Sequence, residues 1–169
     1  MKNQFINHKK IFVAVIALLA VTATVVIYIQ LVGIGVLAVT DASDGKVYRM
    51  YPVKVGDTFS IGFIHSVNKS PLIDYYEIKA DGIYVEKTVY YGFGAGVQTE
   101  LSEGEKLEYG QDGSMIVSGF DKKMTDLTYF VGTVSDHTLR INEGKDISLR
   151  DLCGRNSRVR FSYMKWKFF

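Results

Sequence analysis

The hydrophobic pattern of this 169-residue chain changes its period once. Residues Ile11 to Ile29 carry no charge and only three polar side chains, and these 19 residues are long enough to cross a hydrocarbon core of about 30 Å as a helix. After residue 40 no segment keeps a helical period. Apolar residues alternate with polar ones instead, as at Phe59, Ile61 and Phe63, which is typical of strands. The pattern therefore predicts one apolar helix followed by a strand-rich domain.

Turn signals separate the alternating segments at short intervals, as at Asp81-Gly82 and Asp112-Gly113. Asp-Gly between such segments indicates a hairpin, because a type I′ turn needs a positive φ at both central residues. We predict strands at residues 33–40, 46–51, 57–66, 73–79, 83–91, 105–110, 114–119, 126–134, 137–142, 146–150 and 158–168. The expected fold class is all-β, an antiparallel sandwich or barrel of about ten strands, preceded by one N-terminal transmembrane helix.

The apolar helix divides the chain into three predicted parts. Residues 1–10 contain three lysines and no acid, so the positive-inside rule places this basic tail in the cytoplasm. Residues 11–30 are predicted to form a transmembrane signal anchor, and residues 31–169 an extracytoplasmic all-β domain. The alternative is a cleaved signal peptide, but the apolar segment continues past the plausible cleavage site near residues 20–23. We therefore expect a cell-membrane protein with a single membrane pass.

Charge and cysteine content exclude several kinds of partner and site. The formal net charge of +2 combines +3 from residues 1–10, −6 from residues 11–149 and +5 from residues 150–169. No basic stripe runs through the domain, so nucleic acid is not an expected partner. The basic, aromatic C-terminal segment is either an alternating strand with a solvated face or a contact for anionic lipid or an acidic partner. Cys153 is the only cysteine, which excludes an intramolecular disulfide.

The main candidate site is a histidine–carboxylate pair at a predicted hairpin. If the loop 67–72 closes an antiparallel pair with Ser66 opposite Ile73, His65 lies opposite Asp74. Directly opposite residues have Cβ atoms about 4.5–5.5 Å apart, within reach of an imidazole–carboxylate hydrogen bond. A carboxylate beside a histidine fixes its tautomer and raises its basicity, which serves a ligand site or a general base. The other interpretation is a buried pair that only secures the hairpin.

Neighbouring residues modify this candidate site. Ser66 has the opposite strand parity to His65, and no G-x-S-x-G elbow is present, so Ser–His nucleophilic chemistry is not expected. His137 has the inward parity of its own strand and is a weaker candidate for a zinc-type set with His65 and Asp74. The glycine-rich segment at 94–96 is either a sharp strand corner or a backbone nest for an anionic group. The candidate ligand-binding residues are therefore His65, Ser66, Asp74, Gly94, Ala95 and Gly96; no catalytic residue is assigned and no cofactor is expected.

The same residues carry a resemblance to a bacterial family, the domain of unknown function DUF1850. The resembling motifs are His65-Ser66-Val67, Pro71 followed three residues later by an acid, Tyr76 and Gly94-Ala95-Gly96, with looser similarity over residues 31–163. One departure is Asp74, where the family more often has glutamate. The resemblance implies an envelope protein that is often encoded beside a TRAP-type solute importer with a TAXI-class receptor. It implies no particular activity.

Three classes of function are consistent with these observations. The first is a membrane-anchored extracytoplasmic accessory or binding module, whose partner is a TRAP-type importer, its solute receptor or a small carboxylate, in addition to membrane lipid around the helix. The second is a metal-assisted or acid–base enzyme that uses His65 and Asp74. The third is a structural envelope interaction domain. The absence of a convincing catalytic set in the sequence favours the first class over an enzyme.

Overall fold

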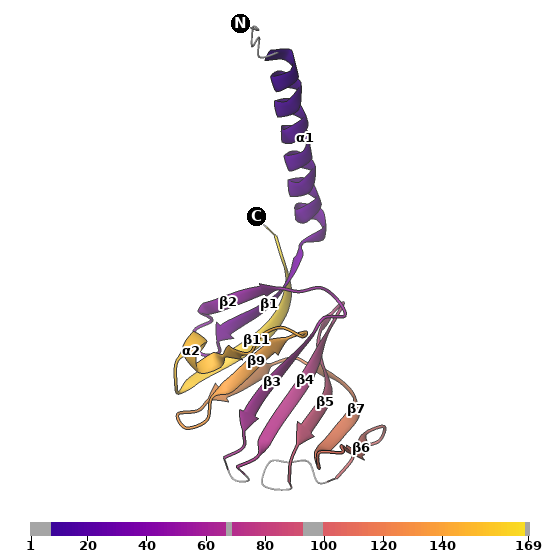
Figure 1. Cartoon of the computed structure of the whole chain (residues 1–169), viewed down its shortest axis with the longest axis vertical. Coiled ribbons are helices and arrows are strands. Elements are labelled where there is room, and N and C mark those ends of the chain that lie inside the picture. The colour runs from indigo at the N-terminus through magenta and orange to yellow at the C-terminus, as the bar shows by residue number, and fades with distance from the viewer. Residues whose placement is uncertain (1–7, 67–68, 93–99, 168–169) are drawn as a thin grey trace, which may run out of the picture. The chain divides into compact units, whose positions relative to one another are not determined.

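A computed structural model of the chain describes residues 8–66, 69–92 and 100–167. In chain order the elements (Figure 1) are α1 (His8–Val32), β1 (Ile34–Asp41), β2 (Val47–Pro52), β3 (Thr58–Ile64), β4 (Pro71–Lys79), β5 (Gly82–Tyr90), β6 (Lys106–Tyr109), β7 (Met115–Met124), β8 (Leu127–Val131), β9 (His137–Ile141), β10 (Ile147–Ser148), α2 (Leu149–Cys153) and β11 (Ser157–Trp166). By its internal contacts the chain divides into two units, Met1–Ile34 with Lys165–Phe169, and Gly35–Met164.

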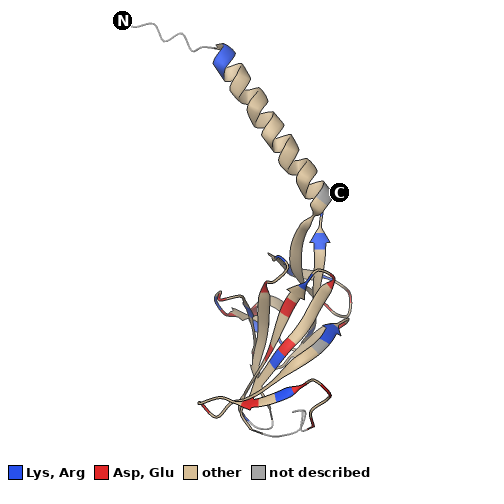
Figure 2. Cartoon of the chain, turned by 90° about the vertical axis from the view of Figure 1, so that its right-hand side faces the viewer, with Lys and Arg blue, Asp and Glu red and all other residues tan. Residues whose placement is uncertain are grey.

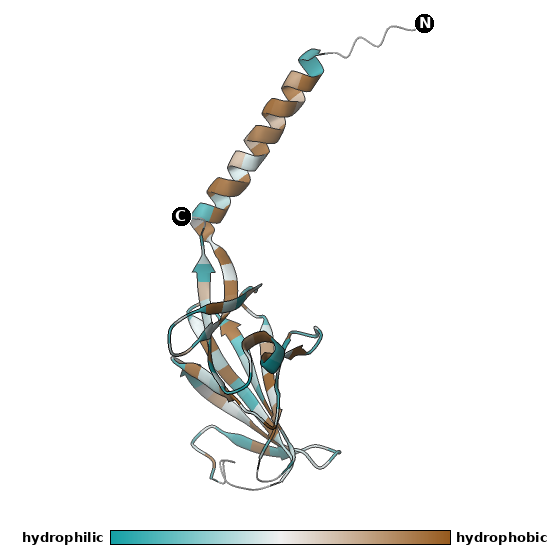
Figure 3. Ribbon diagram, turned by 90° about the vertical axis from the view of Figure 1, so that its left-hand side faces the viewer, coloured by the Kyte–Doolittle hydropathy of each residue, from teal (hydrophilic) through white to brown (hydrophobic). Residues whose placement is uncertain are grey.

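The helix α1 is apolar and exposed along its length. Figure 3 shows hydrophobic residues over most of the helix, and Figure 2 shows basic residues at its start with no charged residue further along. Its segment His8–Gln30, with 23 residues, is the one helix among the described residues that is long and apolar enough to cross a membrane. A membrane anchor and a signal sequence both have this character. The predicted apolar helix is therefore confirmed.

The strands form two mostly antiparallel sheets that are stacked as a sandwich (Figure 1). One sheet has four strands in the order β2-β1-β11-β8, and the other has seven in the order β10-β9-β3-β4-β5-β7-β6. Neither sheet closes into a barrel within the described part of the chain. The predicted all-β class is confirmed in its sandwich form.

A single hydrophobic core joins the two sheets. Phe59 of β3 stacks on Tyr76 of β4 with ring centroids 5.0 Å apart, and on Phe161 of β11 at 6.1 Å. Fully buried aliphatic side chains from both sheets surround these rings, among them Leu37, Ile61, Ile78, Leu139 and Val159. Each large apolar side chain that is fully buried contributes roughly 1.5–3 kcal/mol relative to an exposed one. This core is what the alternating apolar positions of the sequence specify.

The seven-stranded sheet has more strands than its partner and carries a second, smaller apolar cluster on β4, β5 and β7. The buried members of this cluster are Leu72, Tyr90, Met115 and Val117. A bulge bends β7 here, because residues 85 to 87 of β5 face residues 118 to 122 of β7. Gly119 lies in this bulge with φ at +84°, a left-handed conformation that favours glycine. The bulge lies where the pairing of β7 with β6 ends.

The predicted strands differ from the structure mainly at their ends. The strand predicted at 146–150 is wrong in its second half, because Leu149–Cys153 is the helix α2. The Ser148 side chain caps this helix, its Oγ accepting a hydrogen bond from the Asp151 amide at 3.0 Å. The strand predicted at 126–134 ends at Val131, and the residues after it form a loop. This loop is part of the site described next.

Candidate functional site

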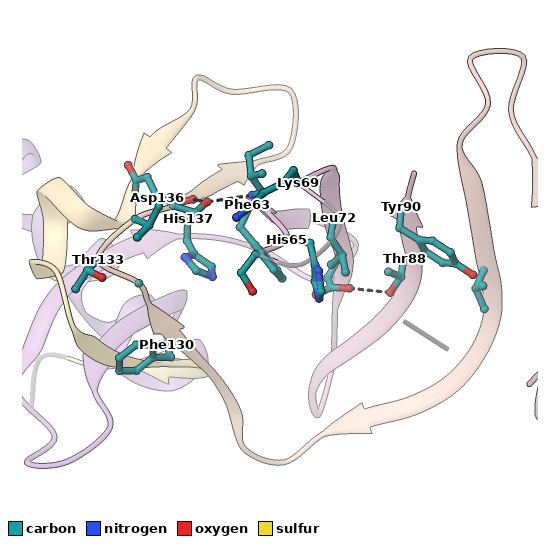
Figure 4. A pocket seen from close by; sticks show the side chains of 17 residues that line it. Phe63, His65, Lys69, Leu72, Thr88, Tyr90, Phe130, Thr133, Asp136 and His137 are labelled. Atoms are coloured by element: carbon teal, nitrogen blue, oxygen red, sulfur yellow. Dashed lines mark hydrogen bonds between the residues drawn. The ribbon is translucent and has the colours of Figure 1, made fainter. Parts of the chain in front are cut away.

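A cleft of about 1130 Å³ lies in the second unit (Figure 4). It is larger than the roughly 300–1,000 Å³ typical of small-molecule sites. Its lining comes from β3, β4, β5, β7, β8 and the first residue of β9, and from the loop residues 65, 66, 69 and 132–136. The apolar lining residues are Phe63, Ile64, Leu72, Tyr90, Val117, Phe130 and Val134. The polar and charged ones include His65, Ser66, Lys69, Asp74, Thr88, Thr133, Ser135, Asp136 and His137. The cleft therefore combines an apolar wall with a few polar groups, as binding sites for organic molecules do.

The hairpin between β3 and β4 has a different register from the predicted one. Ile64 pairs with Pro71, and beyond this pair the His65 amide donates to the Ser70 carbonyl at 2.8 Å. Lys69 adopts a left-handed φ of +54°, and its amide donates to the His65 carbonyl at 2.9 Å. The predicted register started β4 only after Pro71, but proline is tolerated at the first residue of a strand. The strand β4 therefore begins earlier, and the hairpin loop lies between Ile64 and Pro71 instead of between Ser66 and Ile73.

This register corrects the predicted histidine–carboxylate pair. Asp74 lies opposite Ile61, so His65 is not its cross-strand partner. His65 lies beyond the end of β3, in the loop, where strand parity no longer decides which way a side chain faces. Both side chains nevertheless line the same cleft, and so does Ser66. The predicted cross-strand pair is therefore wrong, and ligand binding by these residues stays a prediction.

Asp74 is held inside the sandwich by hydroxyl donors. Its Oδ1 accepts a hydrogen bond from Thr88 Oγ1 at 2.7 Å, and its Oδ2 accepts one from Tyr129 Oη at 2.5 Å. Tyr129 Oη also lies 2.6 Å from Tyr76 Oη. Burial raises the pKa of the Asp74 carboxyl above 3.8, and the bonds from Tyr129 and Thr88 oppose this shift. Asp74 is thus a carboxyl whose protonated form is favoured relative to an exposed aspartate.

His137 presents a buried nitrogen without a partner. Its side chain is 8% exposed, stacks on Phe63 with ring centroids 4.6 Å apart, and lies edge-on to Tyr129 at 6.0 Å. Its Nδ1 is buried and makes no hydrogen bond with any described residue. Burial lowers the pKa of His137 below 6.5, Asp136 opposes the shift and Arg150 reinforces it. A neutral imidazole with an unused nitrogen at the wall of a cleft is unusual, because buried polar atoms in proteins are normally paired.

Asp136 fixes the loop that carries one wall of the cleft. Its carboxylate accepts hydrogen bonds from Ser148 Oγ at 2.5 Å and from the Arg150 amide at 3.0 Å. Burial would raise the pKa of Asp136, but these two bonds, the His137 amide and the charge of Arg150 together lower it. Ser135 Oγ accepts a hydrogen bond from the Ile64 amide at 3.2 Å and so ties the loop to the end of β3. His137 is therefore held in place by its immediate neighbours.

The cleft gathers some of the predicted site residues and omits others. His65, Ser66, Asp74 and His137 all line it. No three His, Cys, Asp or Glu side chains among the described residues are close enough to hold a metal ion, so the considered His65, Asp74 and His137 metal set is not formed. Gly94, Ala95 and Gly96 lie outside the described residues. Four polar residues of the cleft were therefore among the predicted site residues, but their mutual arrangement was not predicted.

The sequence did not suggest Thr88, which lines the cleft, or Tyr129, which binds Asp74 beside it. Thr88 faces inward in step with Tyr90, and the alternation of β5 is a signal that could have found it. Tyr129 alternates with the buried Leu127 and Val131, so its inward direction was readable from the sequence. Its bond to a carboxylate on the other sheet was not readable, since nothing local relates the two strands.

Comparisons with known proteins give one family. The family model described as "Domain of unknown function (DUF1850)" matches residues 59–149, which include β4, β9 and every lining residue of the cleft. No curated protein and no solved structure matches the chain significantly. The match therefore covers more than half of the chain and all of the candidate site.

Proposed function

The chain belongs to the DUF1850 family, and we propose that it is a membrane-anchored extracytoplasmic module that binds a small solute in its cleft. The observation that carries this proposal is His137, whose buried Nδ1 lacks a partner at the wall of a cleft of about 1130 Å³. An unpaired buried polar atom costs about 1–3 kcal/mol, and a ligand that pairs with it recovers part of that cost. The apolar helix α1 supports the anchored state.

A small carboxylate with an apolar body is the proposed solute class. Lys69 is the lysine of the lining and lies exposed in the hairpin loop, where it can attract an anion. The carboxylate of Asp74 accepts hydrogen bonds from two hydroxyls, and its raised pKa reduces the negative charge inside the cleft. Phe130, with 56% of its surface exposed, offers an apolar wall for the body of the solute.

Calorimetric titration of the full-length chain in detergent tests this solute class. The probes are phenylacetate and its neutral amide, phenylacetamide. We expect phenylacetate to bind more tightly, and Lys69→Asn to weaken its binding by about two- to five-fold, as expected for one exposed charge pair. Asparagine tolerates the left-handed conformation of Lys69, so the loop is preserved.

Lys145→Asn is the matched control, because Lys145 is exposed and does not line the cleft. It should leave phenylacetate binding unchanged. Equal binding of the two probes, or equal effects of the two lysine substitutions, would contradict a carboxylate site at Lys69. Binding of neither probe would contradict a small-carboxylate site in the cleft.

A TRAP-type importer or its TAXI-class receptor is the proposed protein partner. This partner comes from the family resemblance, and a solute-binding module beside an importer would hand over or retain the transported carboxylate. Pull-down of the full-length chain from its native membranes, followed by identification of the captured proteins, tests the proposal. Unchanged capture and unchanged transport with His65→Ala would contradict a role of His65 in this contact.

Acid–base chemistry on the bound solute is the second candidate function. Two residues of the cleft favour this function, because the pKa of Asp74 is raised and the pKa of His137 is lowered. In such chemistry the neutral imidazole would accept a proton from the solute, and a protonated carboxyl would donate one to it. Phenylacetate incubated with the protein in D₂O would then exchange its Cα protons, which proton NMR detects as signal loss. An unchanged signal would contradict proton abstraction from this probe.

A further inference from the structure

The first unit contains a junction between the end of α1 and the end of the chain. Gly33 follows the helix with φ at +77°, and its amide donates to the Ile29 carbonyl at 2.8 Å, which closes the last helical turn. A Cβ at Gly33 would lie 3.0 Å from Lys165 Cβ and 3.6 Å from Lys167 Cγ. The glycine therefore ends the helix and also lets the stems of these two lysines lie against it.

The side chains at this junction are of the kind found at membrane surfaces. Lys165 and Lys167 are exposed, and Trp166 between them is 38% exposed. Tryptophan is enriched at the boundary between hydrocarbon and water, where its ring lies in an apolar layer and its N–H in a polar one. Lysines beside a membrane helix attract anionic lipid headgroups. The sequence alone left open whether this segment contacts lipid, an acidic partner or only water.

The length of α1 decides at which level these side chains lie. The apolar stretch His8–Gln30 has 23 residues, which corresponds to roughly 34 Å of helix and matches a hydrocarbon core of about 30 Å. When Lys9 and Lys10 lie at one surface, the end of the helix at Gly33 reaches the other. Lys165, Trp166 and Lys167, which lie at Gly33, are then at the headgroup level.

We propose that Lys165, Trp166 and Lys167 form a contact site for anionic phospholipid headgroups at the C-terminal end of α1. The occupant is lipid and not an acidic protein, because the same unit contains the apolar helix that brings these side chains to the membrane surface. The inference rests on the anchored state of the proposed function and is independent of solute binding in the cleft.

Tryptophan fluorescence tests this site directly, because Trp166 is the only tryptophan of the chain. The full-length protein is placed in nanodiscs of phosphatidylcholine, with or without phosphatidylglycerol, that contain a lipid with a nitroxide on its headgroup or deep in its acyl chain. We expect the headgroup quencher to act more strongly than the deep one. We also expect phosphatidylglycerol to raise headgroup quenching at least about twofold, and salt to reverse the rise.

Two double variants separate the basic site from general charge effects. Lys165→Gln with Lys167→Gln should abolish the effect of phosphatidylglycerol, while Lys106→Gln with Lys145→Gln, both exposed lysines of the second unit, should preserve it. Water-like emission of Trp166 without lipid quenching would overturn the proposal and favour a segment that contacts only water. Quenching that is the same with and without phosphatidylglycerol would also overturn it.

A flotation assay distinguishes failure of this site from failure of the proposed function. Full-length protein that does not float with alkaline-washed liposomes would overturn the anchored state and the headgroup site together. Phenylacetate binding in the cleft would be unaffected by that result. Protein that floats but shows no lipid quenching of Trp166 would overturn the headgroup site alone.

Discussion

Tyr129 Oη donates a hydrogen bond to Asp74 Oδ2 at 2.5 Å, across 55 residues of sequence and between the two sheets of the sandwich. The bond joins β8 of one sheet to β4 of the other beside the cleft. Burial and the Asp74 charge both raise the pKa of the Tyr129 hydroxyl, so this group stays protonated and can donate below pH 10. The pair therefore links the stability of the sandwich to the geometry of the cleft.

Loss of this donor should destabilise the fold. Tyr129→Phe leaves Asp74 Oδ2 and the Tyr76 hydroxyl without their partner inside the sandwich. We expect a decrease of about 1–3 kcal/mol in the free energy of unfolding, measured by urea denaturation of the full-length chain in detergent. Tyr109→Phe is the control, since Tyr109 is 69% exposed and its substitution should change little. Equal effects of the two substitutions would contradict a stabilising role of the buried bond.

The raised pKa of Asp74 should make the fold less stable as the pH rises. The folded state holds the Asp74 proton more tightly than the unfolded state, whose pKa is near 3.8. Its contribution is therefore most favourable below pH 3.8 and is lost as the pH rises through the raised folded-state value. Asp74→Asn should remove this fall, which urea denaturation at a series of pH values would measure. If the free energies of unfolding of wild type and Asp74→Asn change in parallel with pH above 3.8, the raised pKa of Asp74 is contradicted.

The unpaired nitrogen of His137 should cost stability that binding recovers. His137→Phe keeps an aromatic ring against Phe63 but removes the buried Nδ1, so we expect the free energy of unfolding to rise by about 1 kcal/mol. The same variant should weaken phenylacetate binding. His137→Ala is the comparison, because it removes the whole ring and should destabilise the fold. A less stable His137→Phe variant would contradict the cost assigned to the nitrogen.

The lowered pKa of His137 gives a second pH effect with the opposite sign. The unfolded state, with a histidine pKa near 6.5, binds this proton more tightly than the folded state does. The contribution of His137 to stability is therefore complete above pH 6.5 and falls as the pH drops through the lowered folded-state value. Urea denaturation of wild type and of His137→Phe, at a series of pH values from above 6.5 downward, isolates the contribution of His137 to the free energy of unfolding. A difference between the two proteins that does not vary with pH would contradict it.

The bulge in β7 should tolerate only glycine at position 119. A Cβ there would clash with the Gly104 carbonyl oxygen and would also occupy a left-handed φ. Gly119→Ala should therefore lower the free energy of unfolding by about 2–4 kcal/mol, the sum of backbone strain and steric clash. Gly113→Ala is a matched control, because Gly113 has φ at +80° but no atom near its Cβ position. It should lose only about 1 kcal/mol, and thermal unfolding would compare the two variants.

Local pattern in the sequence determined the elements of this protein. The uncharged segment from Ile11 to Ile29 specifies the helix, since length and lack of charge suffice for it. The alternation at Phe59, Ile61 and Phe63 specifies a half-buried strand, since successive side chains point to opposite faces. Turn residues such as Asp81-Gly82 separate the strands. The short helix after Ser148 also had a local signal, the capping serine with Asp151 three residues later, which the alternation obscured.

Only the tertiary structure decided what these elements bring together. The strand β4 begins at Pro71, and this start sets the register of the hairpin. In this register Ile61 lies opposite Asp74, whereas the predicted register placed His65 there. The bond between Tyr129 and Asp74 depends on which strands face each other across the sandwich, and no neighbouring residues encode that choice. The sequence by itself thus determined the strands and the inward direction of their side chains, because both follow from backbone geometry over a few residues. The cleft itself depends on how strands that are far apart in the sequence pair and pack, which no local pattern encodes.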